Sequence, residues 1–240
     1  MSSEPAEGPT PPGRGGRISF ATVPSSTAWY SFLLRPLIVA SNAAVSAWLY
    51  PCWRTARIVW HPPLDVLAQR VKNTGRPIIY YSWHAYEPML FLGMRDVPAF
   101  LRPIAIGHDG VLSRMLQSTG ARLGYHMWIY RRTSAIRPRD QIIELIRARS
   151  CNIGLVTDAG GPYGRVKPGL VEIARATNAW VVPLVLRGRP ILKLRWPWRY
   201  GIPLPRCRVK VFNGQPLDGR EATLRDYQSA MDDLENTAGA

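Results

Sequence analysis

Short apolar runs alternate with amphipathic segments along most of this 240-residue chain. Apolar runs typical of buried strands are predicted over 57–60, 77–82, 100–106, 121–130, 152–157, 180–186 and 208–212. Apolar positions three and four residues apart predict helices over 64–72, 88–94, 110–118, 137–149, 168–177 and 222–234. Strands and helices that alternate at this pitch predict an α/β fold, in which helices flank a mostly parallel or mixed sheet.

The N-terminal part of the chain has a different composition. Residues 1–27 are rich in Pro, Gly and Ser and predict a disordered tail, whereas residues 28–53 are the most apolar segment. Arg35 and Pro36 interrupt this segment and leave residues 37–50 free of charge, fewer than the roughly 20 residues that span a membrane. We expect an interfacial anchor helix with aromatic residues at headgroup level. A buried core helix and a tilted span are the alternatives, and residues 54–240 form the single α/β domain.

The charge of the chain limits its partners. A formal net charge of +15, almost all of it Arg, favours nucleic acid, anionic lipid or phosphorylated substrates. Residues 187–210 carry many basic residues and no acid, with Trp and Tyr interleaved, which is typical of an RNA-binding or bilayer-binding surface or of a solvated face. The apolar segment 28–50 favours the bilayer over RNA as the partner of this basic surface. Three scattered Cys without CxxC spacing argue against a disulfide framework and a zinc site, and favour a reducing compartment.

His84 is the first candidate for chemistry. It follows the apolar run 78–82, and a titratable imidazole at the end of a buried strand is well placed to act as a general base. Glu87 lies three residues later, so both side chains share a face if the turn is helical. A purely structural His84 is the alternative, as is a Glu87 that only interacts with the dipole at a helix N-terminus.

A second motif, Gly107-His108-Asp109-Gly110, precedes the helix predicted over 110–118. Asp109 is expected to cap that helix, or to help bind an acceptor if the loop faces His84. We expect His108 to be a solvated loop residue. His61 and His126 are expected to be structural.

A glycine-rich basic loop at 158–169 is the third motif. Asp158 ends a predicted strand, and glycines including Gly160 and Gly161 allow backbone amides to point inward as an anion nest. Arg165 and Lys167 are suitable phosphate ligands, and the helix that follows adds its positive end. Neither a Walker-type loop nor the GxGxxG pattern is present. The loop therefore indicates a phosphate on the acceptor or donor, with a solvated glycine turn as the alternative.

Four motifs occur in a fixed order: Trp83-His84, His108-Asp109-Gly110, Asp158 to Gly169, and Val181-Val182-Pro183-Leu184. In this order and spacing the chain resembles the lysophospholipid acyltransferase superfamily, and specifically its bacterial DUF374-type branch, over about residues 55–216. The resemblance implies an α/β acyltransferase fold. It also implies transfer of a fatty acyl group from an acyl-CoA or acyl-carrier-protein thioester, which acts as a co-substrate. The reaction requires no metal, and we expect no bound cofactor.

The chain departs from the superfamily pattern at two places. The superfamily's acidic partner lies five positions after the His, but here that position is Met89, and Glu87 is the nearest substitute. Relatives read Asp-Gly-Pro-Arg-Gly-Pro where this chain reads Asp-Ala-Gly-Gly-Pro from residue 158, so we expect Arg165 to replace the missing guanidinium. Asp158 is expected to organise the loop.

The expected function is transfer of the acyl group to a hydroxyl of a lysophospholipid or related phosphate-bearing lipid, with His84 as general base. The expected location is the cytoplasmic face of the inner membrane, with membrane phospholipids as partners and no nucleic acid. The alternative is a catalytically inactive, membrane-peripheral lipid-binding protein of the same fold. A nucleic-acid-binding protein fits the apolar segment 28–50 poorly.

Overall fold

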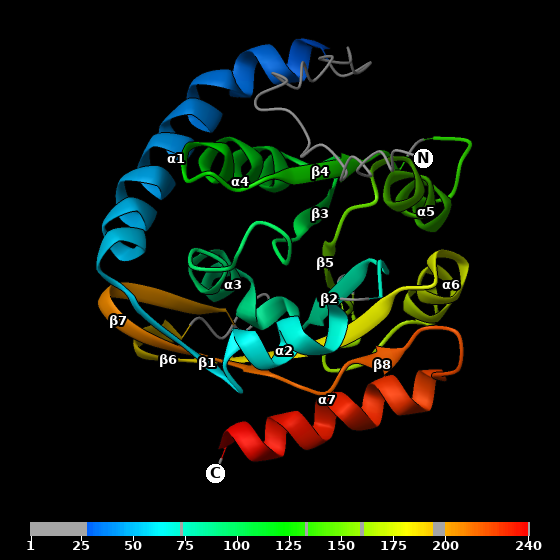
Figure 1. Cartoon of the computed structure of the whole chain (residues 1–240). Coiled ribbons are helices and arrows are strands. Elements are labelled where there is room, and N and C mark those ends of the chain that lie inside the picture. Colours follow the sequence, from blue (N-terminus) through cyan, green and yellow to red (C-terminus); the bar gives the residue numbers. More distant parts are fainter. Residues whose placement is uncertain (1–27, 73, 133, 159–160, 194–199, 240) are drawn as a thin grey trace, which may run out of the picture. The chain divides into compact units, whose positions relative to one another are not determined.

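The computed structural model describes residues 28–72, 74–132, 134–158, 161–193 and 200–239. It divides the chain into two units, residues 1–36 and 37–240. The tail predicted over residues 1–27 lies outside the described residues. Of the first unit, only the beginning of α1 is described, and the α/β fold belongs to the second unit (Figure 1).

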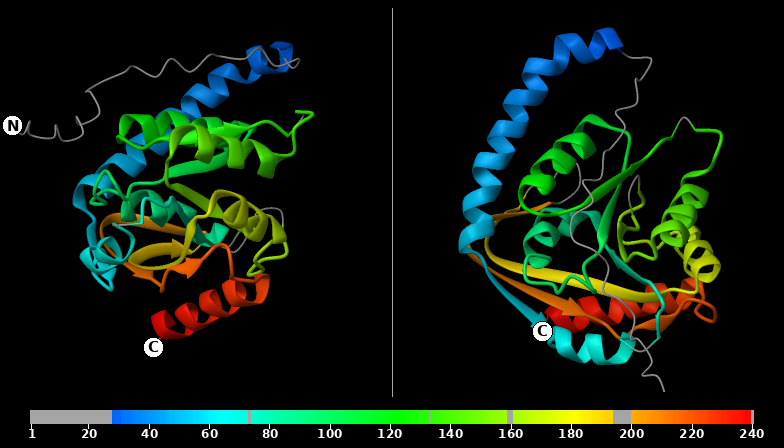
Figure 2. Two further views of the ribbon diagram at one scale, coloured as in Figure 1. Left: turned by 45° about the vertical axis from the view of Figure 1, so that its right-hand side comes forward. Right: turned by 45° about the horizontal axis from the view of Figure 1, so that its top comes forward.

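The second unit is built on a mixed sheet with eight strands among the described residues (Figures 1 and 2). The strands are β1 (Arg57–His61), β2 (Ile78–Ser82), β3 (Ile104–His108), β4 (Met127–Tyr130), β5 (Ile153–Val156), β6 (Trp180–Lys193), β7 (Gly201–Asn213) and β8 (Leu217–Asp218). Their order is β1-β7-β6-β2-β5-β3-β4, and β8 pairs with β6. The β6–β7 and β6–β8 pairs are antiparallel and the others are parallel. The predicted α/β fold with a mixed sheet is confirmed.

The helices are α1 (Ala28–Thr55), α2 (Leu64–Val71), α3 (Glu87–Gly93), α4 (Val111–Arg122), α5 (Pro138–Arg149), α6 (Pro168–Thr177), α7 (Leu224–Gly239) and the 3-10 turn η1 (His84–Tyr86). Proline in the first turn starts α3, α5 and α6. Residues in the left-handed region, Ser150 and Asn178, end α5 and α6. Helices cover both faces of the β6–β7 part of the sheet. On one face Gly93 of α3 lies against Val211 of β7, and on the other Arg187 of β6 forms an ion pair with Glu235 of α7.

Several predicted boundaries are wrong. The strand predicted from residue 100 begins only at Ile104, because residues 98–102 form a turn in which Leu101 N–H donates to the Pro98 carbonyl. The strand predicted over 121–130 is restricted to Met127–Tyr130 because α4 continues to Arg122. Strands β6 and β7 are much longer than predicted. The additional residues of β6 are half-buried or exposed, and those of β7 mix buried and exposed positions, so they do not show the continuous apolar pattern of a buried strand.

Helix α1 runs through Pro36, where the sequence predicted an interruption. Its last turns contribute to the core, with Leu49 and Cys52 buried and the Ser46 and Thr119 hydroxyls 3.1 Å apart. The C-terminal end of the predicted anchor is therefore a packed core element, while Val39 and Tyr50 are exposed. Among the described residues, no helix combines the length and the hydropathy that a membrane crossing requires.

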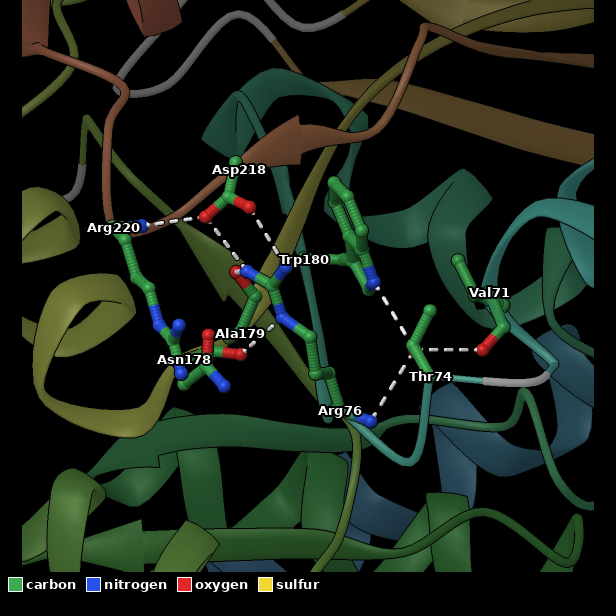
Figure 3. Close-up of polar contacts among 8 residues, drawn as sticks. All are labelled: Val71, Thr74, Arg76, Asn178, Ala179, Trp180, Asp218 and Arg220. Carbon is green, nitrogen blue, oxygen red and sulfur yellow. Dashed lines mark hydrogen bonds and ion pairs between the residues drawn. The ribbon is translucent and has the colours of Figure 1, made fainter.

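Arg76 connects the start of β2 to the end of α6 and to β8 (Figure 3). Its guanidinium donates to both carboxylate oxygens of Asp218, at 2.7 and 2.8 Å, and to the Asn178 carbonyl at 2.7 Å. It also lies over the Trp180 ring, 4.1 Å from the centroid. This contact fixes the beginning of β2, the strand that leads to His84, at the amino end of the parallel strands.

Candidate functional site

His84 lies where the parallel strands β2 and β5 end side by side. Strand β2 is buried throughout, and Thr157 N–H, just after β5, donates to the Ser82 carbonyl at 3.0 Å. The His84 backbone N–H then donates to Asp158 Oδ1 at 2.7 Å. Asp158 is only 2% exposed, so a buried carboxylate at the end of the neighbouring strand fixes the backbone of His84.

Glu87 lies beside the imidazole of His84. The turn at His84–Tyr86 is helical and continues into α3, which places Glu87 Oε2 3.6 Å from His84 Nε2. Less than a fifth of either side chain is exposed. Tyr200, at the entrance to β7, donates its hydroxyl to Glu87 Oε2 at 3.4 Å, and its ring centroid lies 5.6 Å from that of His84. The shared face expected from the spacing is present, and the catalytic role of the pair stays a prediction.

Burial shifts the protonation equilibria of both side chains. It lowers the pKa of His84, an effect that Asp158 opposes and His108 reinforces. Burial also raises the pKa of Glu87 to about 7; the hydrogen bond from Tyr200 opposes this shift and the charge of Asp158 adds to it. At neutral pH the imidazole is therefore mainly uncharged, and the neighbouring carboxyl group exchanges its proton in the same pH range. This combination suits a general base.

Met89 occupies the position at which the superfamily carries its acid. Its side chain is buried against β6 and β7, where a Cβ added to Gly188 or Gly201 would lie 2.9 and 3.0 Å from Met89 atoms. This is an apolar packing position on the β6–β7 side of α3. Glu87 is thus the acidic side chain that the described structure pairs with the imidazole of His84.

A cleft with a volume of about 290 Å³, partly open to solvent, lies in front of His84. Its polar lining includes His84, Glu87, His108, Ser113, Arg139 and Lys167. The expectation that His108 is a solvated loop residue is wrong. Strand β3 extends to this residue, which pairs with Tyr130 of β4 and is half-buried with Nδ1 enclosed. Ser113 and Arg139 belong to no motif, so the sequence pattern did not indicate that they line the cleft.

Asp109 does not have the capping role expected for it. The N-cap of α4 is Gly110 without a side-chain hydrogen bond, and Asp109 Oδ1 accepts from the Arg132 N–H at 3.1 Å. Asp109 is not among the residues that line the cleft. Asp109, just after β3, instead binds the loop that follows β4 through its hydrogen bond with Arg132.

The glycine-rich loop enters the cleft through Lys167. Gly161 and Gly164 have positive φ, and Asp158 Oδ2 accepts from the Gly164 N–H at 3.4 Å, so Asp158 organises the loop as expected. Lys167 lines the cleft, whereas Arg165 is exposed and does not. Gly160 lies outside the described residues. Arg139 of α5 lines the cleft as a second cation and forms an ion pair with Glu172.

A small apolar pocket of about 50 Å³ adjoins the cleft behind Glu87. Its walls include Tyr80, Phe91, Met94, Pro103, Tyr125 and Met127. Strands β3 and β5 pair only at Ile104–Ile153 and Ala105–Gly154 and separate beyond that point. The pocket and the cleft share Glu87, Ile106, Leu155 and Val156, so they meet beside the His84–Glu87 pair.

No protein-family model matches the chain. It is 28% identical over 147 residues to the uncharacterized protein RP090 of Rickettsia prowazekii (strain Madrid E). The match covers 58% of this chain and 63% of that protein, so it spans less than two thirds of the relative.

Among solved structures, the chain is similar to the 1-acyl-sn-glycerophosphate (LPA) acyltransferase PlsC from Thermotoga maritima. The TM-score is 0.48 at 15% identity, and the match covers 88% of this chain and 85% of that one. A likeness at this level carries no argument about activity. The assignment of a function therefore rests on the geometry of the cleft.

Proposed function

We propose that this chain transfers a fatty acyl group from an acyl-CoA or acyl-carrier-protein thioester to a hydroxyl of a lysophospholipid or related phosphate-bearing lipid. One observation carries the proposal: the His84–Glu87 pair lies where a polar cleft containing Lys167 meets an apolar pocket. The apolar lining of the pocket suits the methylene groups of an acyl chain next to the thioester, and the cation suits a phosphate. The reacting carbonyl and hydroxyl groups then meet at the imidazole.

In this mechanism the neutral imidazole of His84 accepts the proton of the acceptor hydroxyl. The oxygen attacks the thioester carbonyl carbon, a C–O bond forms, the C–S bond breaks, and the leaving thiolate receives the proton from His84. The Glu87 carboxylate, 3.6 Å from Nε2, stabilises the transient imidazolium. General-base assistance of this kind contributes about 10²–10⁴-fold.

Lys167 is the residue that we assign to the phosphate of the acceptor. It precedes α6 directly, so its ammonium group and the positive end of that helix act on the same part of the cleft. Arg165 is exposed, so the proposal gives it no contact with the reacting groups. We further propose that the chain acts as a peripheral or monotopic protein at the cytoplasmic face of the inner membrane, where soluble thioesters and membrane lysolipids meet.

The direct test supplies the purified chain with acyl-CoA or acyl-carrier protein and vesicles containing single lysophospholipids. We expect thiol release in equal amount to new ester, and a loss of at least about 100-fold in His84→Ala. His61→Ala is the matched control, because His61 is exposed and stacked on Phe212 outside the cleft. Equal turnover by His84→Ala would refute the role of His84. Lysolipid binding by both proteins without turnover would instead identify the inactive lipid-binding alternative.

A further inference from the structure

A row of cationic side chains crosses three adjacent strands on one face of the sheet. Arg57 of β1 pairs with Arg208 of β7, and Arg208 pairs with Arg189 of β6, so the three side chains lie next to one another on the same face. Val59 and Lys210 form the neighbouring pair on that face. We call these five residues the cationic sheet face. All five are exposed.

This arrangement is unfavourable for the isolated fold. Directly opposed side chains on neighbouring strands have Cβ atoms about 5 Å apart, and like charges at that distance destabilise a sheet. Within the part of the chain that the structure describes, no acidic side chain forms an ion pair with any of the four cations of this face. By contrast, Arg187, on the same side of β6, pairs with Glu235 of α7. A row of unneutralised guanidinium groups indicates that an external anion balances their charge.

The cationic sheet face lies at the end of the sheet that also carries His84. Strands β2 and β6 are parallel and in register from Ile78 opposite Trp180, so Arg189 lies beyond the level of His84. Helix α7 packs on this side of the sheet as far as the Glu235–Arg187 pair and ends at Gly239. Arg57, Arg189 and Arg208 therefore lie one residue pair past the point where Glu235 meets the sheet, and Lys210 lies directly opposite Arg187.

We propose that the cationic sheet face docks onto the anionic surface of a phospholipid bilayer. Charge complementarity requires a polyanion, and Val59, 46% exposed and paired with Lys210, adds an aliphatic group that a headgroup layer accepts. The five residues of the face include no aromatic side chain on which the bases of a single-stranded nucleic acid could stack. Docking of the cationic sheet face brings the end of the sheet that carries the His84 cleft close to the bilayer.

The test measures vesicle binding of the full chain by flotation, with neutral phosphatidylcholine vesicles and with vesicles that contain phosphatidylglycerol. The test variant is Arg57→Gln/Arg189→Gln/Arg208→Gln. The matched control is Arg70→Gln/Arg122→Gln/Arg149→Gln, which removes the same charge from exposed residues in the last turns of α2, α4 and α5. We expect binding to the anionic vesicles to weaken on the order of 100-fold in the test variant and only a few-fold in the control. Added salt should weaken the binding of the unmodified chain.

Two further readouts separate the alternatives. Thermal unfolding should show that the test variant is at least as stable as the unmodified chain, because a like-charge row is removed. His84→Ala should bind vesicles normally, so a failure of the acyltransferase proposal would leave this one intact. The docking proposal is overturned if both triple variants bind equally well, or if the unmodified chain binds neutral and anionic vesicles alike. It is also overturned if the test variant loses binding to a single-stranded oligonucleotide but not to vesicles.

Discussion

At the scale of single residues, Glu87 links the stability of the fold to the proposed chemistry. Its side chain is largely buried beside an imidazole, and burial raises its pKa from 4.5 to about 7. A carboxyl group whose pKa is raised on folding stabilises the fold fully below its unfolded pKa, and this stabilisation is lost as the pH rises through its folded pKa. The folded chain thus becomes less stable between about pH 4.5 and 7, where the buried group ionises.

Glu87→Gln is therefore expected to stabilise the protein at pH 8. The pKa shift of Glu87 predicts that the free energy of unfolding of Glu87→Gln exceeds that of the unmodified chain by about 3 kcal/mol at pH 8. Near pH 4.5 the two proteins should differ little. Urea unfolding of both proteins at the two pH values measures the effect. A difference in the free energy of unfolding that is the same at both pH values would show that Glu87 does not titrate as described.

The same substitution should alter the pH dependence of catalysis. If the Glu87 carboxylate stabilises the imidazolium, kcat/KM rises with pH through about 7 as Glu87 ionises. In Glu87→Gln we expect kcat/KM to fall roughly tenfold or more at pH 8 and the inflection near 7 to disappear. A variant that retains the inflection would assign it to another group.

The central pair of the site could be predicted from the sequence, but its surroundings could not. His84 and Glu87 are three residues apart, so local helical geometry brings them together. Tyr200 and His108 reach them only through the order of the strands in the sheet. In the sequence, Arg165 was as suitable a phosphate ligand as Lys167, because the composition of a loop does not determine which of its side chains points into the cleft.

At the scale of elements, α7 holds the glycine-rich loop in place. Gln228 Oε1 accepts from the Val166 N–H at 2.9 Å, and Gln228 Nε2 donates to the Gly164 carbonyl at 3.1 Å. The loop that carries Lys167 is therefore fixed by a helix about 60 residues later in the chain. The sequence predicted both elements, but nothing in the sequence pattern indicated this contact.

Gln228→Ala should loosen this loop. It leaves the N–H of buried Val166 without its partner, which costs about 1–3 kcal/mol, and we expect a raised KM for the lipid acceptor. Hydrogen exchange at Val166 and Gly164 measures the local effect. Asp233→Ala, which truncates an exposed side chain on the same helix, serves as the control. Unchanged exchange in Gln228→Ala would show that the loop is held by other contacts.

At the scale of the whole molecule, the sheet brings together sites that are far apart in the sequence. Alternating strands and helices predicted a mixed or parallel sheet, yet the pattern did not show that β1 pairs with β7 at one edge. That pairing creates the row of Arg57, Arg208 and Arg189. Arg57 and Arg208 lie in strands that the apolar pattern predicted, whereas Arg189 lies in the half-buried and exposed extension of β6, which that pattern could not reveal.

Arg76→Lys tests whether the amino end of the sheet depends on the contact with Asp218. Lysine cannot donate to both carboxylate oxygens and to the Asn178 carbonyl, so we expect a loss of about 1–2 kcal/mol in the free energy of unfolding. The hydrogen bonds from Arg76 hold the pKa of Asp218 at about 2, so the difference should shrink only in strong acid, as the pH falls through that value. Equal stability of the two proteins at pH 7 would contradict this role.

The most direct measurement of the proposed function is lipid mass spectrometry of cells that produce either the unmodified chain or His84→Ala at equal levels. We predict that one phospholipid class gains an acyl chain, and its lysophospholipid is depleted, only with the unmodified chain. Identical lipid profiles in the two strains, with both proteins folded and bound to membranes, would contradict the proposed acyl transfer.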